Sequence, residues 1–324
     1  MIMLTIPKST KDIVKEVLRN VYDKVRPSYF SIFNSRKFTV TIHNNYSGFF
    51  AQLNWCLYIF SFCEDKGLIP DIYLTGDNYL APELGENWFQ YFFEVPELVG
   101  DKNIYRNSQN KLIKSITITH ILQLLLPSEH FDKMTVLYAS NLMKKYMHIN
   151  QHIQTKVNTY FQKYFQSKFV LGIHYRGTDK IVESPRVSWE YVKKVVNNYL
   201  KKHPKVDCLF VASDEGDFID YIKNEFQCIP VFNHEDQLKA INNQAFHHIN
   251  LGRDNFKKGE EALINALLLS RCNVLIRTSS FLSGWASIFN PDLPIILLNS
   301  PNKDTLWFPD KELISKSMNQ YLIE

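Results

Sequence analysis

An apolar run that ends in a group of ionisable and hydrogen-bonding side chains lies between residues 169 and 180. Residues 169–173 have the composition of a buried parallel strand, and ligands of open α/β sheets bind just beyond the carboxyl ends of such strands. Arg176 offers a planar fork of donors and Lys180 a compact charge, a pair that suits a pyrophosphate. The alternative is a solvated strand end with a surface Asp-Lys pair. The candidate binding residues here are His174, Arg176, Thr178, Asp179 and Lys180.

Two later strand ends carry polar side chains of a similar kind. Ser213 and Asp214 follow an apolar run at 206–212, and Asp214 could accept hydrogen bonds from a ribose or order the loop of Arg176. After the run at 273–277, a Thr-Ser-Ser sequence enters a helix, where free backbone N–H groups and hydroxyls suit a phosphate. Simple helix capping is the alternative at both places. The candidate phosphate-binding residues of the second segment are Thr278, Ser279 and Ser280.

The alternation of apolar runs and helical patterns in the second half predicts a parallel sheet with crossover helices, an α/β fold. The polar stretch 233–257 is long for a loop and is expected to cover a ligand. Helices are expected from Ser188, as N-cap, to Leu200, from Ser213 or Asp214, as cap, to Phe226, and at 258–271 and 282–289. Five strands are expected, at 169–174, 206–212, 228–232, 273–277 and 293–298.

The first half is expected to contain one βαβ unit, with strands at 38–43 and 71–74 and a helix at 50–63. The aromatic cluster 88–93 is interpreted as core rather than as a platform for a sugar ring. Further helices are predicted at 129–147 and 150–166. The turn after the first strand could line a cleft from the acceptor side through Asn45, Tyr46 and Gly48.

Composition bounds the class of protein. The chain has 324 residues, 45% of them apolar and 14% aromatic, which suffices for a large core and about two domains. A net charge of +4 without a dominant basic block argues against a nucleic-acid partner. The N-terminus lacks a signal-like apolar core, and no run approaches the length of a membrane span, so we expect a cytoplasmic protein and leave peripheral membrane contact open. Five scattered cysteines without Cys-x-x-Cys spacing favour buried thiols over a zinc site or disulfides: Cys56, Cys63, Cys208, Cys228 and Cys272.

The run from His174 to Lys180 resembles the donor-binding signature of the α-1,6-fucosyltransferase and nodulation fucosyltransferase group, which is related to the protein O-fucosyltransferases. In that group the pattern is His-x-Arg-Arg-Thr-Asp-Lys, and it holds GDP-fucose. Gly177 stands here at the second arginine, which puts one phosphate or fucose contact in doubt. The resemblance extends over about 168–291. It implies a GT-B-like architecture, in which two Rossmann-like domains face a central cleft.

The resemblance also implies roles for single residues. Arg176 and Lys180 would meet the phosphate charge, and Glu183 would be the general base, since the group carries a glutamate shortly after its Thr-Asp-Lys. Asp179 is the alternative base, but an aspartate beside two cations is a poor proton acceptor and is better suited to orient them, and Glu183 could also be an ordinary loop carboxylate. His174 would contact the nucleotide base. The group has an aspartate that pairs with guanine where this chain has Asn265. Either the base is held differently, Glu261 substitutes, or the donor is not a guanine nucleotide.

Metal and cofactor requirements are expected to be absent. The chain has no Asp-x-Asp motif, and the cations of the signature could stabilise the departing diphosphate. His234, His247 and His248 lie in one polar stretch, but no carboxylate or cysteine completes a persuasive metal-ligand spacing. We therefore expect no metal site and no cofactor beyond the nucleotide-sugar substrate.

The preferred function is an inverting, metal-independent glycosyltransferase that moves fucose from GDP-fucose to a glycan acceptor. The alternatives are a transferase for another nucleotide sugar and a non-catalytic nucleotide-sugar or glycan-binding domain. An enzyme should bind the donor and slowly hydrolyse it without acceptor, whereas a binding domain should not. We expect an acceptor-side domain at 1–165 and a donor domain at 166–324, with the segment from about Lys311 packing back on the first.

Overall fold

The computed structural model describes residues 37–94, 133–177, 184–234, 251–301 and 307–322. Its largest sheet has the five parallel strands that the sequence predicts, and the structure shows them in the order β7-β6-β5-β8-β9. The chain moves outward from β5 in one direction, then returns and continues on the other side from β8, so the strand order reverses between β5 and β8. The strands are β5 (Val170–Tyr175), β6 (Cys208–Ser213), β7 (Val231–Phe232), β8 (Val274–Arg277) and β9 (Ile295–Leu297).

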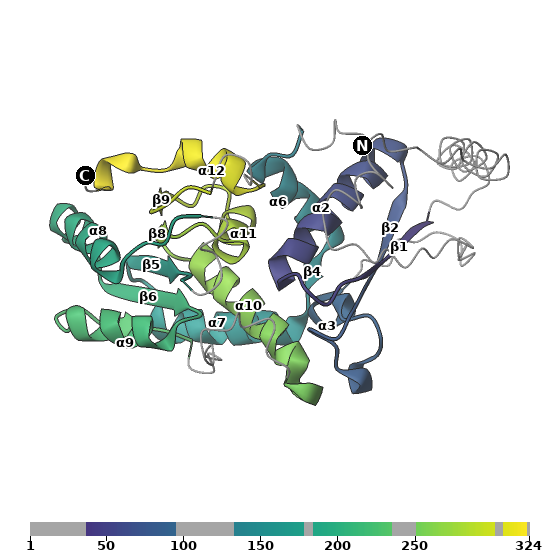
Figure 1. Cartoon of the computed structure of the whole chain (residues 1–324), viewed down its shortest axis with the longest axis horizontal. Helices are drawn as coiled ribbons and strands as arrows, with labels where there is room; N and C mark the ends of the chain where they lie inside the picture. Colours follow the sequence, from purple (N-terminus) through teal and green to yellow (C-terminus); the bar gives the residue numbers. More distant parts are fainter. Residues whose placement is uncertain (1–36, 95–132, 178–183, 235–250, 302–306, 323–324) are drawn as a thin grey trace, which may run out of the picture.

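Helices cover both faces of this sheet (Figure 1). One face packs against α8 (Trp189–Lys202) and α9 (Gly216–Glu225), through alternate residues of β5 such as Leu171 and Ile173. The other face packs against three helices: α7 (Gln151–Tyr164), α10 (Asn255–Ser270) and α11 (Phe281–Phe289). Burial on both faces explains why these strands read as continuous apolar runs.

The predicted helix boundaries hold with local differences. Ser188 caps α8 as expected, its Oγ accepting a hydrogen bond from the backbone N of Tyr191 at 3.2 Å. The prediction that Ser213 or Asp214 caps the next helix is wrong: α9 begins at Gly216, and the Ser213 Oγ accepts from the backbone N of Glu215 at 3.0 Å. That bond forms a tight turn before the helix rather than a cap on it. Of the strand predicted at 228–232, only the last two residues pair with the sheet, as β7.

The first half contains the expected βαβ unit. The parallel strands β1 (Lys37–His43) and β2 (Ile69–Thr75) flank α2 (Phe49–Lys66), which is buried along almost its whole length. The remaining elements are η1 (Pro82–Leu84), α3 (Phe89–Phe92), β3 (Phe93–Glu94), α6 (Val136–Tyr146) and β4 (His148–Ile149), and β3 pairs with β4. Within the described residues, α6 and α7 correspond to the two helices predicted at 129–147 and 150–166.

The aromatic cluster 88–93 belongs to the core, as predicted. Trp88, Phe89 and Phe92 are almost completely buried. Phe92 meets Phe49 of α2 edge to face, with ring centroids 5.1 Å apart. Such a pair is an ordinary core contact, so these rings are not available as a sugar platform.

The C-terminal segment contacts both parts of the molecule. Glu312 in α12 (Asp310–Lys316) accepts a hydrogen bond from the backbone N of Val136 at 2.5 Å, and the Phe308 carbonyl accepts from Asn54 of α2 at 2.5 Å. The chain then returns to the large sheet in η6 (Asn319–Tyr321), where the Tyr321 carbonyl accepts from Asn198 of α8 at 2.8 Å.

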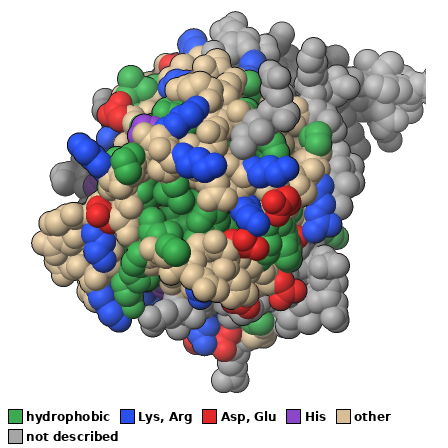
Figure 2. All heavy atoms as spheres, turned by 90° about the vertical axis from the view of Figure 1, so that its left-hand side faces the viewer, with side chains coloured by type: hydrophobic (Ala, Val, Ile, Leu, Met, Phe, Trp, Pro, Cys, Tyr) green, Lys and Arg blue, Asp and Glu red, His purple; other side chains and the backbone are tan. Residues whose placement is uncertain are grey.

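The end of the molecule that carries α8, α9 and the C-terminus shows hydrophobic side chains at its centre, with Lys and Arg side chains around them (Figure 2). No described helix combines the length and the apolar character that a membrane crossing requires. The expectation of buried thiols holds for four of the five cysteines and is wrong for Cys228, which is exposed, three residues before the short edge strand β7.

Candidate active site

The predicted binding residues of three strands come together at one edge of the large sheet. In the strand register, His174 of β5 lies beside Ala212 of β6 on one side and Arg277 of β8 on the other. The residues that follow, Arg176, Asp214 and Thr278, therefore leave the sheet at the same carboxyl edge. This edge includes the point between β5 and β8 where the strand order reverses, which is where α/β sheets bind ligands.

Arg176 is tied to both neighbouring strands. Its Nε lies 3.9 Å from Oδ2 of Asp214, and its backbone N donates to Oγ1 of Thr278 at 2.9 Å. These contacts hold the guanidinium in place. The side chain is 20% exposed, so it can still reach a ligand. Asp214 thus stands where it can order Arg176, which is one of the two roles predicted for it.

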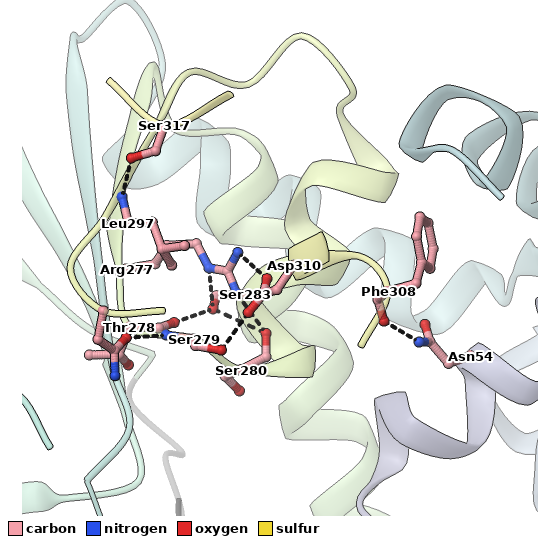
Figure 3. Close-up of polar contacts among 11 residues, drawn as sticks. Asn54, Arg277, Thr278, Ser279, Ser280, Ser283, Leu297, Phe308, Asp310 and Ser317 are labelled. Atoms are coloured by element: carbon pink, nitrogen blue, oxygen red, sulfur yellow. Dashed lines mark hydrogen bonds and ion pairs between the residues drawn. The ribbon is translucent and has the colours of Figure 1, made fainter. Parts of the chain in front are cut away.

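A buried ion pair lies directly behind this edge, and the sequence reasoning missed it. Arg277, the last residue of β8, and Asp310, the first of α12, are both fully buried, with Nη1 and Oδ1 2.6 Å apart. Figure 3 shows the guanidinium also pointing at Ser283 and Ser280. Its Nε donates to the Ser283 Oγ at 2.9 Å and its Nη2 to the Ser280 carbonyl at 2.9 Å. The available signal was an arginine that ends an apolar strand, but nothing local identified its partner.

The predicted phosphate-binding segment is attached to the same network. The Ser279 Oγ donates to Oδ2 of Asp310 at 2.5 Å, and its backbone N donates to Oδ1 of Asn299 at 2.7 Å. The Thr278 hydroxyl accepts from Arg176, while the Ser280 Oγ is buried without a hydrogen-bond partner among the described residues. Ser280 occupies the N-cap of α11 without a side-chain cap bond, so helix capping does not account for it. A role of these three residues in donor binding stays a prediction.

His174 is buried beside two guanidinium groups. Burial, Arg277 and Arg176 together hold the pKa of its imidazole well below the usual range, so the ring is neutral at physiological pH. Its Nδ1 has no hydrogen-bond partner within the described part of the chain. A neutral imidazole can donate from one nitrogen and accept at the other, which is compatible with the predicted contact to a nucleotide base.

Asn265 and Glu261 lie on α10, and both are buried. The Oδ1 of Asn265 lacks a hydrogen-bond partner among the described residues. A buried amide oxygen without a partner is costly unless a ligand or water supplies a donor. The Asn265 amide oxygen is thus positioned to accept a hydrogen bond from a ligand.

The predicted acceptor-side residues sit in the loop after β1. The Asn45 Oδ1 accepts from the backbone N of Asp77 at 2.8 Å, which joins the loops after β1 and β2. Tyr46 is 61% exposed, and Gly48 is the N-cap of α2 in an extended conformation that any residue can adopt. Asn45 thus supports the loop, and Tyr46 is the side chain of this group that is open to solvent.

The start of α10 lies against these loops. Asn255 Nδ2 donates to the Asp77 carbonyl at 2.8 Å, and the Nζ of Lys258 lies 5.8 Å from the ring centroid of Tyr79. Tyr79 is buried, which raises its pKa, and the Arg176 charge opposes that rise, so Tyr79 lies within electrostatic range of Arg176. Sequence reasoning missed Tyr79 and Lys258, because neither belongs to a local motif.

Lys258 yields a pH-dependent prediction. Burial lowers its pKa to about 8, whereas an unfolded lysine has an ordinary value near 10.5. Between these values the unfolded chain binds more protons than the folded chain, so the free energy of unfolding contributed by Lys258 rises with pH. We expect Lys258→Met to be more stable than wild type at pH 7, by roughly 1–2 kcal/mol, with the difference shrinking towards pH 10.

Thermal unfolding from pH 7 to 10 measures this difference. Lys257→Met is the matched control, because Lys257 is half-exposed beside Asp254 and should leave the pH profile unchanged. Parallel profiles of wild type and Lys258→Met would contradict the prediction.

Several predicted residues cannot be placed. Thr178, Asp179, Lys180 and Glu183 of the signature, and His247 and His248 of the polar stretch, lie outside the described residues. Among the residues that are described, no cluster of three or more His, Cys, Asp or Glu side chains is arranged to hold a metal ion.

Known proteins resemble the chain in sequence and in fold. The model of the family described as Nodulation protein Z (NodZ) matches residues 139–313, more than half of the chain. A search of curated proteins found no match. Among solved structures, a NodZ α-1,6-fucosyltransferase soaked with GDP-fucose aligns at 16% identity and a TM-score of 0.50, covering 83% of this chain and 97% of that one.

Two further structures align with lower scores. A FUT1 point mutant from Arabidopsis thaliana in complex with GDP is 12% identical, with a TM-score of 0.47 and coverage of 84% of this chain and 72% of that one. A POFUT1 structure in complex with GDP is 11% identical, with a TM-score of 0.47 and coverage of 80% and 98%. At these identities, structural similarity concerns the fold, an α/β arrangement with a parallel sheet.

Proposed function

Because the chain belongs to the nodulation protein Z (NodZ) family, we propose that it transfers fucose from GDP-fucose to a glycan acceptor. It is a glycosyltransferase by family membership. The observation that carries the finer proposal is the position of Arg176. It leaves the central strand at the switch point of the parallel sheet, held by Asp214 and Thr278, with its guanidinium still accessible.

The proposed reaction is a single inverting displacement. The acceptor hydroxyl oxygen attacks the anomeric carbon of fucose from the face opposite GDP, and its proton passes to Glu183. The bond between the anomeric carbon and the β-phosphate oxygen breaks, and GDP leaves with the electron pair. Arg176 and Lys180 meet the charge that grows on the diphosphate, with Asp179 orienting them. Two cationic side chains can supply this stabilisation without a metal ion, so we propose metal-independent transfer.

We further propose that the donor site is formed by the carboxyl edge of the large sheet. Besides the cations, the donor contacts would come from His174, Thr178, Asp214, Asn265, Thr278, Ser279 and Ser280. Support comes from the buried polar atoms that lack partners among the described residues, on His174, Asn265 and Ser280. Such atoms are expected where a ligand completes the hydrogen bonding.

The acceptor would approach from the loops after β1 and β2, where Asn45, Tyr46 and Gly48 lie. We propose a GT-B-like arrangement with domains at 1–165 and 166–324 facing a cleft. In its favour, the start of α10 contacts the Asp77 loop of the first half, and Tyr79 lies near both Lys258 and Arg176. Helix α10 would then bridge the two sides of the cleft.

Calorimetric titration with GDP, UDP, ADP and CDP in the presence of EDTA tests this function. We expect selective binding of GDP that EDTA does not weaken. Preference for another nucleotide would replace the donor and favour a different nucleotide sugar, an outcome that Asn265 makes worth testing. Absence of nucleotide binding, or its loss in EDTA, would contradict the proposal. Arg271→Ala is a suitable control, because Arg271 precedes β8 and lies at the opposite edge of the sheet.

A further inference from the structure

Two consecutive carboxylates after β6 each lie beside one guanidinium group. Asp214 Oδ2 lies 3.9 Å from Arg176 Nε, and Glu215 Oε1 lies 3.5 Å from Arg186 Nη2. Arg176 comes from the end of β5, while Arg186 comes from the segment that leads into α8. Besides Arg176 of the signature and the buried Arg277, Arg186 therefore places a further guanidinium near the carboxyl edge of the sheet.

Glu215 is positioned to hold Arg186 and not to cap its own helix. It is the N-cap residue of α9, yet its side chain makes no cap bond. Instead its Oε2 accepts from Nε1 of Trp189 at 3.2 Å, which fixes the carboxylate from the side of α8. Burial and the neighbouring Asp214 raise the pKa of Glu215, and the Arg186 charge opposes this rise.

Gly177 is explained by the same carboxylate. A Cβ atom at Gly177 would lie 2.2 Å from Glu215 Oε1 and 2.7 Å from Cε1 of Tyr175. The φ of Gly177 is not positive, so glycine is required there for space and not for backbone conformation. Any larger side chain would have to displace the Glu215 carboxylate. The Nη2 atom of Arg186 lies 3.5 Å from Oε1 of Glu215, and this oxygen lies 2.2 Å from the Cβ position at Gly177. Nη2 is therefore within the reach of an extended arginine side chain that would start from that Cβ.

We propose that Arg186 is a second diphosphate-binding guanidinium, which serves from the segment before α8 in place of the arginine that Gly177 lacks. The inference rests on the proposed function and identifies a further residue that recognises the nucleoside diphosphate. The Arg186 side chain is 54% exposed, so its donors are open to a ligand while Glu215 holds one side of it. A nucleoside diphosphate offers one phosphate group to each arginine, and bidentate pairing with phosphate favours arginine over lysine.

Calorimetry with GDP as the probe tests this inference on the full chain. Arg186→Ala should weaken GDP binding by about 10- to 100-fold, the range for one charge-assisted contact. Arg186→Lys retains the charge and loses the fork, so its affinity should fall between those of Arg186→Ala and wild type. Arg271→Ala removes an exposed arginine at the opposite edge of the sheet and should stay within twofold of wild type. Thermal unfolding without ligand should show that all three variants remain folded, because both arginines are exposed, so a change in GDP affinity would not reflect a loss of structure.

The outcomes separate this inference from the proposed function. If wild type binds GDP and Arg176→Ala abolishes binding, but Arg186→Ala stays within twofold of wild type, the role of Arg186 is overturned and the function stands. If wild type binds no nucleotide, the function itself fails. A loss of GDP affinity equal in Arg186→Ala and Arg271→Ala would also overturn the inference, since it would reflect overall charge rather than a built contact.

Discussion

Arg176→Ala is expected to lower kcat/KM for fucosyl transfer by about 100- to 1000-fold or more, with little effect on folding. The guanidinium stands at the switch point of the sheet beside Asp214, where we propose that it meets the diphosphate, so its loss leaves the developing negative charge without that partner. Transfer or slow hydrolysis of GDP-fucose measures the rate, and thermal unfolding measures folding. GDP affinity should fall together with the rate, because the same contact binds product and transition state.

Glu183→Gln is the contrasting variant for this prediction. An amide cannot take the proton of the acceptor hydroxyl, but it leaves the diphosphate contacts in place. We therefore expect normal GDP binding with a large loss of turnover, whereas Arg176→Ala should lose both. Full activity in Arg176→Ala would remove Arg176 from the site, and full turnover in Glu183→Gln would remove Glu183 from its proposed role.

The second large effect is expected at the buried ion pair of Arg277 and Asp310. Asp310→Ala should reduce the free energy of unfolding by about 3–5 kcal/mol, because it leaves the Arg277 charge buried without its carboxylate. The Ser279 hydroxyl loses its acceptor in the same variant. Urea denaturation followed by circular dichroism measures the change.

A double variant and a surface pair on the same helix provide the controls. Arg277→Met combined with Asp310→Leu removes both charges and should recover much of the lost stability, since two apolar residues need no ionic partner. Lys316→Ala breaks the exposed pair with Glu312 in α12 and should cost less than about 0.5 kcal/mol. If Asp310→Ala were as mild as Lys316→Ala, the pair would contribute nothing to stability.

Local pattern was sufficient to predict the framework of the second half of the chain. The five parallel strands, the helices between them and the placement of His174, Arg176 and Asp214 at strand ends were all predictable, because alternation of apolar runs and helical periods is written along consecutive residues. The sheet register then had to bring those ends together, since parallel strands share one carboxyl edge. The family resemblance rests on the segment from His174 to Lys180, which begins at one of these strand ends.

Tertiary structure decided which polar groups are available at that edge. Thr278 and Ser279 looked equally free in the sequence, but one accepts from Arg176 and the other donates to Asp310. The cap expected at Ser213 became a turn because its hydroxyl bonds to the backbone two residues on. Cys228 was expected to be buried, yet it lies on the surface. Hydrogen-bond partners and exposure depend on neighbours that no local period specifies.

By itself, the sequence determined the α/β class, the succession of strands and helices along the chain, and the chemical types at the carboxyl edge of the large sheet, because these follow from residue periodicity and from one short motif. Only the tertiary structure decided that Arg277 pairs with Asp310, that Lys258 lies over Tyr79, and that Glu215 fills the space beside Gly177 and holds Arg186. The physical reason is that each of these contacts joins different elements of the chain. Their formation depends on how the elements pack, and packing is a property of the whole fold.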